Sequence, residues 1–229
     1  MVKRPKTETT KPAGGVGDQR IAEIKYPRRT ERRKRTRAKI LEVAAKQFSE
    51  TGYGATTMQN IADAADVHVT TLFMHFKAKG DIALSLAALS IDSFRSRAFE
   101  AREKVSVFDF VRQEALAVAK ALKSRTSSGL GLWSALYRDK DLAFAWSEYD
   151  REQKSVIADY VAAAYGFDRE VDYRPDIVAS LLLTSAFLPH RRWLETSSQV
   201  NLAHEIAAAM NTGESAARHI LKSLPSTAS

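Results

Sequence analysis

The sequence predicts an all-α protein, in which an N-terminal three-helix helix-turn-helix domain precedes a larger helical domain. Three observations predict it. No proline occurs between Pro27 and Pro175. Residues that favour helices are abundant, and no long run shows the period-two alternation that strands require. A hydrophobic content of 45% over 229 residues is enough for a core and excludes a wholly disordered chain.

Residues 1–29 are predicted to form a flexible basic arm, because Gly and Pro lie among Lys, Thr and Arg without apolar periodicity. Residues 1–40 carry 14 Lys or Arg against four Asp or Glu, while the whole chain has a net charge of +8. A basic head on a nearly neutral remainder favours an anionic polymer as partner. Nucleic acid is the first interpretation; an anionic membrane surface or a solvated tail are the alternatives.

The first helix is expected over residues 30–51. Its apolar residues recur at spacings of three and four, so they share one face. They are Ile40, Leu41, Ala44, Ala45 and Phe48. Gly52 can end this helix in the left-handed conformation, and Tyr53 can fold back onto it.

A second, short helix is expected to start at Thr56 or Thr57, where Thr56 and Gln59 have the spacing of a capping box. Its inner face contains Met58, Ile61, Ala62 and Ala65.

A tight turn at Asp66 and Val67 ends this helix, because Asp tolerates the left-handed conformation. A third helix from His68 to about Phe76 is expected to turn Leu72, Phe73 and Phe76 inward, and Asp81 to cap a long helix after it.

Two short helices joined by a tight turn describe a helix-turn-helix unit. The basic run at residues 28–37 lies directly ahead of it. A basic segment followed by this unit favours DNA as the partner. Residues 30–80 are therefore predicted to be a DNA-binding domain, and residues 81–229 a helical domain for effector binding and dimerisation.

Several stretches resemble the TetR family of bacterial transcriptional regulators. They are Ile40 to Phe48, Gly52-Tyr53, Ala55 to Thr57, Ile61 to Ala65, Thr71 to Phe76, and Lys79. The resemblance covers residues 33–82, about a fifth of the chain. It implies a small DNA-binding head on a larger dimerising body that binds a ligand.

The sequence departs from the usual family pattern at four places. Asp66 replaces a Gly at the turn, and His68 replaces a Ser-like cap. Phe73 and Met74 replace tyrosines that reach phosphates, and Gly80 replaces a Glu. Two phosphate contacts are thereby lost, because neither Phe nor Met donates a hydrogen bond.

The candidate DNA-binding residues lie on the first, second and third helices. They are Arg32, Arg33, Arg35, Arg37, Thr57, His68, Val69, Thr70, Thr71, Met74, His75, Lys77 and Lys79. Val69 to Thr71 offer methyl groups and hydroxyls to base edges, and the resemblance places His75 and Lys79 on the DNA backbone. The alternatives are internal packing for Thr71, a helix cap for Thr57, and solvent exposure for His68, His75 and Lys79.

Aromatic residues are dense in one part of the predicted body and can line a ligand pocket, although a plain core is the competing interpretation. The candidate effector-binding residues are Trp133, Tyr137, Phe144, Trp146, Tyr149, Phe187 and Arg191. Arg191 belongs to a His190–Arg192 cluster that suits either an anionic ligand group or a solvated helix end.

The helix that Pro175 opens is apolar on nearly every side, so it needs cover from two directions. We expect one side to pack on the domain and the other on a second subunit, giving a two-fold four-helix interface. The predicted interface residues are Val178, Leu182, Leu188, Ile206 and Met210. A buried core within one chain is the alternative.

The chain contains no Cys, and its His residues lack the spacing of a metal site. It carries no nucleophile elbow, phosphate-binding loop or dinucleotide fingerprint. The expectation is a cytoplasmic protein without membrane contact, cofactor, metal or enzyme activity. We expect a homodimeric transcriptional regulator, a repressor that a small, largely apolar effector releases from a palindromic DNA operator. The alternative is a non-specific nucleoid-associated or scaffold DNA-binding protein.

Overall fold

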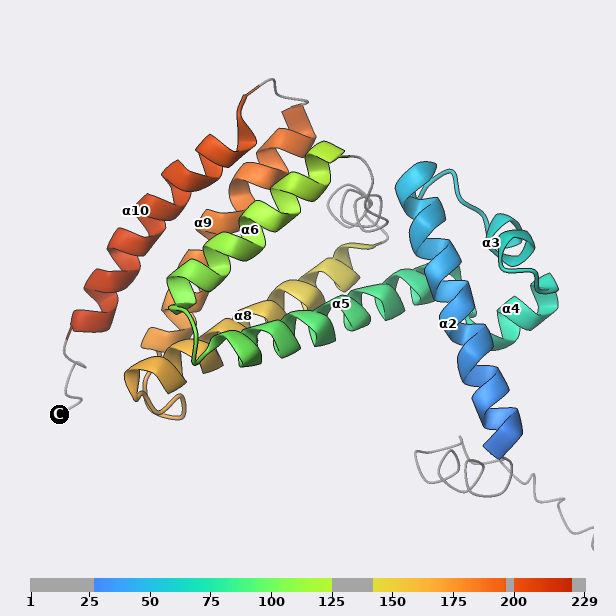
Figure 1. Cartoon of the computed structure of the whole chain (residues 1–229), viewed down its shortest axis with the longest axis horizontal. Helices are drawn as coiled ribbons and strands as arrows, with labels where there is room; N and C mark the ends of the chain where they lie inside the picture. Colours follow the sequence, from blue (N-terminus) through green and yellow to red (C-terminus); the bar gives the residue numbers. More distant parts are fainter. Residues whose placement is uncertain (1–26, 125–141, 197–199, 224–229) are drawn as a thin grey trace, which may run out of the picture.

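The structure is a computed structural model that describes residues 27–124, 142–196 and 200–223. These ranges contain eight helices and no strand, as the sequence predicts. The helices are α2 (Pro27–Glu50), α3 (Met58–Ala64), α4 (Val69–His75), α5 (Lys79–Ala101), α6 (Val107–Ser124), α8 (Ala143–Tyr165), α9 (Arg174–Thr196) and α10 (Leu202–Lys222). We call α2–α4 the head and α5, α6 and α8–α10 the body; α5 runs from one into the other (Figure 1).

Helix α2 begins at Pro27, three residues before the predicted start. Residues 27–29 are therefore helical, which corrects their assignment to the arm; a proline in the first turn is compatible with a helix because it needs no N–H partner there. Residues 1–26 lie outside the described part. At the other end, Gly52 has φ +86°, and the ring of Tyr53 packs 5.1 Å from that of Phe48.

The cap of α3 differs from the prediction by one residue. Thr57, not Thr56, is the N-cap: its Oγ accepts from the backbone N–H of Asn60, and Asn60 Oδ1 accepts from the backbone N–H of Thr57. Thr56 is buried, and its hydroxyl donates to the carbonyl oxygen of Gly52 at 2.8 Å. After α3, Asp66 has φ +55°, the left-handed turn that the sequence predicts.

The head has its own hydrophobic cluster, which also takes in the first turn of α5 and one residue just before α8. Its buried residues are Ile40, Leu41, Ala44, Phe48, Tyr53, Ile61, Ala62, Ala65, Leu72, Phe76, Ile82, Ala83 and Leu142. Phe73 is not among them: its side chain is 48% exposed, so the prediction that it points inward is wrong. Because Leu72 and Phe76 already fill the inner face four residues apart, Phe73 falls on the outer side.

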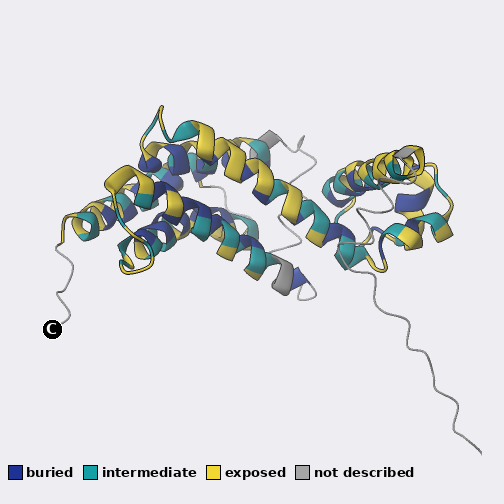
Figure 2. Ribbon diagram, turned by 90° about the horizontal axis from the view of Figure 1, so that it is seen from below, coloured by how far each residue is buried: buried dark blue, intermediate teal, exposed yellow. Residues whose placement is uncertain are grey.

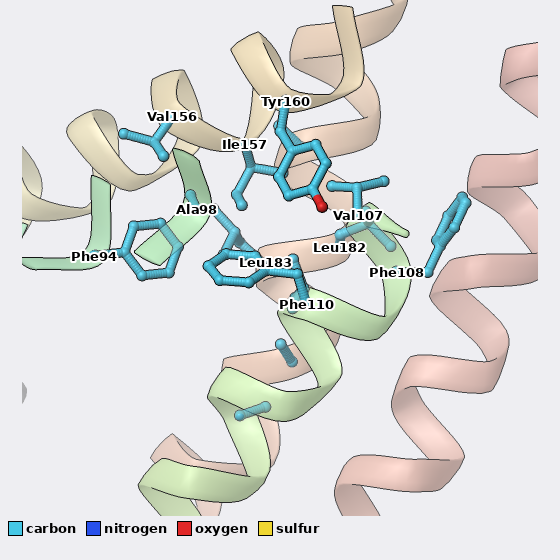
Figure 3. Packing of buried hydrophobic residues seen from close by; sticks show 14 of the residues in the cluster. Phe94, Ala98, Val107, Phe108, Phe110, Val156, Ile157, Tyr160, Leu182 and Leu183 are labelled. Carbon is cyan, nitrogen blue, oxygen red and sulfur yellow. The ribbon is translucent and has the colours of Figure 1, made fainter. Parts of the chain in front are cut away.

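The body forms the second and larger cluster, with the buried faces of its helices turned toward one another (Figure 2). At its centre the ring of Phe110 lies 5.5 Å from Phe94 and 5.8 Å from Tyr160, between α5, α6 and α8 (Figure 3). The Tyr160 hydroxyl donates to the carbonyl oxygen of Val105 at 2.7 Å, so the polar group inside this core has a partner.

Helices α9 and α10 lie against each other along their length (Figure 1). Gly213 permits this approach, since a Cβ there would lie 2.7 Å from the Cβ of Ser185. Four of the residues predicted for a dimer interface are completely buried inside the chain: Val178, Leu182, Ile206 and Met210. Their assignment to a subunit interface is wrong, because α9 turns Val178 and Leu182, and α10 turns Ile206 and Met210, into the core of the same chain. Leu188 alone of the five is exposed.

Within the described ranges, no helix combines the length and the apolar character needed to cross a bilayer. The same ranges hold no group of three or more His, Asp or Glu side chains placed to bind a metal ion.

Candidate nucleic-acid interface and body cavity

Helix α4 has a buried side and an exposed side. Leu72 packs into the head cluster, whereas Thr70, Phe73 and Met74 are exposed, Met74 to 70%. Val69 and Thr71 are half-buried. The exposed side is therefore mainly apolar, with one hydroxyl at its start. This surface offers methyl and ring contacts to a partner and few hydrogen bonds.

His68 caps α4. Its Nδ1 lies 2.8 Å from the Thr70 hydroxyl and accepts from the Thr70 backbone N–H at 3.4 Å. The imidazole thus takes the place of the Ser-like cap of the resembled family, and its ring is otherwise exposed. The sequence analysis did not consider this role, although the position directly before a short helix is where a capping acceptor is expected.

Arg37 is held within the protein. Its guanidinium donates to the Ser85 hydroxyl at 2.8 Å and to the carbonyl oxygen of His75 at 3.3 Å. The same group lies 4.1 Å from the centre of the Phe76 ring. Arg37 therefore ties α2 to the end of α4 and to α5, a structural role in place of the predicted DNA contact.

Lys79 is held even more closely. Its ammonium donates to the carbonyl oxygens of Tyr53 (2.6 Å), Thr56 (2.9 Å) and Gly54 (3.5 Å). It also lies 4.1 Å from the centre of the Tyr53 ring. An ammonium has three donors, and all three face the loop between α2 and α3. This geometry favours a clamp on that loop over the predicted contact with phosphate.

Several exposed cations of the head lie on the first turns of α2, and another lies just after α4. Arg28, Arg32, Arg33 and Lys77 are exposed, and Arg35 pairs with Glu31 at 3.2 Å in full contact with solvent. Arg35 can exchange Glu31 for a phosphate at little cost, because an exposed ion pair contributes little to the stability of the protein. His75 is half-buried, and its pKa is lowered by burial and by the charges of Arg33 and Arg37.

The body contains a cavity of about 140 Å³ between α5, α6, α8 and α9. Its lining residues are Ser90, Phe94, Arg97, Glu114, Val118, Leu122, Trp146, Tyr149, Gln153, Phe187, His190 and Leu194. Trp146, Tyr149 and Phe187 are brought together here, as the sequence predicts. Trp133 and Tyr137 lie outside the described residues, as does the side chain of Phe144.

Arg191 does not line this cavity. It borders a neighbouring, more open hollow of about 240 Å³, which shares Trp146, Gln153 and Phe187 with the cavity. Its guanidinium lies 3.3 Å from the carboxylate of Glu195. Arg191 therefore lies beside Trp146 and Phe187 in this hollow but not in the cavity, and its contact with an effector stays a prediction.

The polar side of the cavity comes from Tyr149, which the sequence analysis named, and from residues that it did not single out. Arg97 makes two hydrogen bonds to Glu114, at 2.9 and 2.7 Å, so the two charges compensate each other. Burial raises the pKa of Tyr149 well above its usual value, which keeps the phenol neutral, and Ser90 bonds to its hydroxyl. These residues come from three helices, and no spacing along the chain connects them.

His190 is buried, which contradicts its assignment to a solvated cationic cluster. Its Nδ1 lies 3.0 Å from the carbonyl oxygen of Ala186, and its Nε2 lies 2.9 Å from that of Ala115. Burial lowers the pKa of His190 below its ordinary value of 6.5. A usable signal was present: residue 190 follows Leu182 and Ala186 at steps of four on the inner face of α9.

We predict that His190 makes the protein less stable in acid. The unfolded chain takes up a proton near pH 6.5, whereas the buried ring resists it, so stability is complete above this pH and is lost as the pH falls through the folded-state pKa. Denaturant unfolding between pH 7.5 and 5 should show this loss, and His190→Gln should flatten it. Part of the slope should remain from His75. The exposed His204 provides the control: a His204→Gln profile as flat as that of His190→Gln would contradict the assignment.

The fold and the head define a class, a helix-turn-helix DNA-binding regulator with a helical body. Residues 40–86 match the family described as bacterial regulatory proteins, tetR family. The HTH-type transcriptional regulator TcmR of Streptomyces glaucescens is 25% identical over 170 residues, covering 70% of this chain and 74% of that protein. The family match over residues 40–86 and these relatives support the TetR family for this chain.

Two solved structures show how far the fold is shared. One is titled as a TetR-family transcriptional regulator of Mesorhizobium loti: it has a TM-score of 0.58 and 23% identity, with 80% of this chain and 96% of that chain covered. Thermus thermophilus FadR, a TetR-family repressor in complex with lauroyl-CoA, also has a TM-score of 0.58, with 19% identity and 84% and 100% covered. At these identities the likeness concerns the fold.

Proposed function

We propose that this transcriptional regulator is a homodimeric repressor that binds a palindromic operator through its two heads and is released by a small, largely apolar effector in the body cavity. The observation that carries the proposal is the separation of the two hydrophobic clusters: a head with an exposed recognition helix, and a body that contains the cavity. That a protein of the same fold holds a ligand, lauroyl-CoA in Thermus FadR, supports the assignment of the cavity.

The operator is read by the exposed side of α4. This helix contains no Arg, Lys, Asn or Gln, the side chains that pair bidentately with guanine or adenine. Thr70, Phe73 and Met74 instead face outward and suit the methyl groups of thymine. Replacing thymine by uracil at the contacted positions removes those methyl groups and is expected to weaken binding by a few-fold per base, since a buried methyl contributes about 0.8 kcal/mol.

Affinity rests on phosphate contacts from the exposed cations of α2. We predict that the double variant Arg32→Ala, Arg33→Ala lowers operator affinity and reduces the slope of log K against log salt by roughly 2, about 0.9 per lost contact. Arg95→Ala with Arg151→Ala is the matched control, since both arginines are exposed on the body. Titrations at several salt concentrations measure the slopes; equal slopes in the two double variants would exclude α2 from the interface.

The effector acts through Trp146. This residue lines the cavity and packs against both hydrophobic clusters. Leu142, one turn earlier, is buried in the head cluster. A ligand that contacts Trp146 can therefore shift the head relative to the body. The two heads of the dimer have one arrangement that fits the operator and one that does not, and the ligand releases DNA if it binds the second arrangement more tightly than the first.

The test of the function is a selection of bound fragments from genomic DNA, followed by affinity measurements on the selected site and on random DNA. A regulator should prefer its operator by at least about 10³-fold. A ratio close to one would contradict the proposal and identify a non-specific nucleoid-associated or scaffold protein instead.

A further inference from the structure

One polar side chain of the described cavity lining makes no hydrogen bond to the protein. Gln153 on α8 lines the cavity and is 6% exposed. Within the described ranges, no hydrogen bond of the protein reaches its side-chain amide, a group with two N–H donors and an acceptor oxygen. Gln153 is not among the fully shielded side-chain atoms without a partner, and it lines both the cavity and the neighbouring open hollow, so its amide is open to a partner that enters there. A ligand in the cavity supplies one.

The other polar groups of the cavity already have partners. The Arg97 guanidinium is engaged by Glu114 through two hydrogen bonds. The phenol of Tyr149 is bonded to Ser90 and is held neutral by burial, which raises its pKa. His190 is neutral because burial lowers its pKa, so its ring has a single N–H donor, and that donor has a carbonyl oxygen within 3.0 Å. The described lining therefore offers an occupant no unpaired charge, and an ionic group there would remain uncompensated.

The size and the walls of the cavity restrict the occupant further. Its volume of about 140 Å³ is close to that of an engineered cavity of about 150 Å³ that holds benzene. Phe94, Trp146 and Phe187 supply aromatic walls, with Trp146 stacked on Tyr149 at 6.0 Å. Flat rings pack well against such surfaces. The neighbouring hollow shares Gln153, so a substituent can extend past the amide.

We propose that the cavity binds a neutral, flat compound of about one ring that carries a hydrogen-bond donor beside an acceptor, as in a carboxamide or lactam. The Gln153 amide donates to its acceptor and accepts from its donor, while the ring lies between Phe94, Trp146 and Phe187. This inference rests on the proposed function in one respect: it names the chemical class of the effector.

The test measures binding of three probes to the full chain in the absence of DNA: benzamide, toluene and benzoate. Calorimetry or ligand-observed NMR gives the dissociation constants. Benzamide should bind about 10-fold or more tightly than benzoate, whose charge finds no partner. In Gln153→Met the ratio of benzamide to toluene affinity should fall by about 10-fold, the effect of losing roughly two hydrogen bonds. Gln113→Met is the matched control, because Gln113 is exposed on α6.

A second variant keeps the inference testable if Gln153→Met folds poorly. Gln153→Glu adds a carboxylate, so benzamidinium should replace benzamide as the preferred probe. An unchanged benzamide-to-toluene ratio in Gln153→Met, benzoate binding as tightly as benzamide, or no binding of any probe would overturn the inference. These results are independent of operator binding. A chain that binds its operator but not benzamide would support the proposed regulator and contradict the proposed ligand class. A chain that binds benzamide but no operator would support the ligand class and contradict the regulator.

Discussion

Replacing Lys79 by Met is expected to lower the free energy of unfolding by about 2–3 kcal/mol, the range for hydrogen bonds to a charged group. Met retains the length and apolar stem of the side chain but donates nothing to the carbonyl oxygens of Tyr53, Gly54 and Thr56, which Lys79 engages. It also removes the cation over the Tyr53 ring. Denaturant unfolding, monitored by circular dichroism, measures the loss.

Lys77→Met is the matched control, because Lys77 is an exposed neighbour of the same residue type. It should leave stability within about 0.5 kcal/mol of the wild type and act only on DNA affinity and its salt dependence. If Lys79→Met instead retained full stability and lost only one unit of salt slope, the ammonium would be a phosphate contact, as the family resemblance implies, and the clamp would be wrong.

Lys79 illustrates what the sequence could and could not predict in the head. The helices follow from apolar periodicity, and the turns at Gly52 and Asp66 from backbone preferences, since these are local properties. The partner of a long cation is not local: Lys79 bonds to residues more than 20 positions earlier. The error at Phe73 has a related cause. Leu72 and Phe73 are adjacent apolar residues on one turn of α4, and the sequence pattern does not say which of them the rest of the head covers.

The cavity shows the same limit. Trp146 and Tyr149 could be predicted together because aromatic residues are dense in that part of the sequence, and Phe187 could be added as an aromatic residue of a later helix that could face the same space. Gln153 and Glu114 could not be predicted, because α6 and α8 bring them together only in the folded chain. His190 was misassigned for a specific reason. It stands beside Arg191 and Arg192, which are both exposed, and three adjacent basic residues suggested one exposed cationic cluster.

Helix α9 presented a different difficulty. Its sequence is apolar on nearly every side, which correctly indicated that two faces need cover but not which face the chain covers itself. The structure buries Val178 and Leu182 inside. The residues left outside form a second stripe at steps of four and three: Ile177, Leu181, Thr184 and Leu188, of which Ile177 is 51% and Leu188 42% exposed. On α10, the exposed Ala208 lines a hollow together with Leu188 and extends this surface with a small side chain.

The double variant Ile177→Glu, Leu188→Glu is therefore expected to dissociate the dimer that we propose. Four carboxylates would meet across a two-fold interface, where like charges repel and cannot be solvated. A monomer presents one head, so operator affinity should fall by at least about 100-fold, the loss expected when two linked half-site contacts become one. Light scattering gives the mass, and titration with operator DNA the affinity.

Leu89→Glu with Leu116→Glu is the matched control, because both leucines are exposed on other faces of the body. This pair should remain dimeric with unchanged operator affinity, which separates the effect of position from that of added negative charge. Charges at Val178 and Leu182, by contrast, should unfold the chain, since each would be buried without a partner. A dimer that survives Ile177→Glu, Leu188→Glu with intact operator binding would exclude the outer stripe of α9 as the interface.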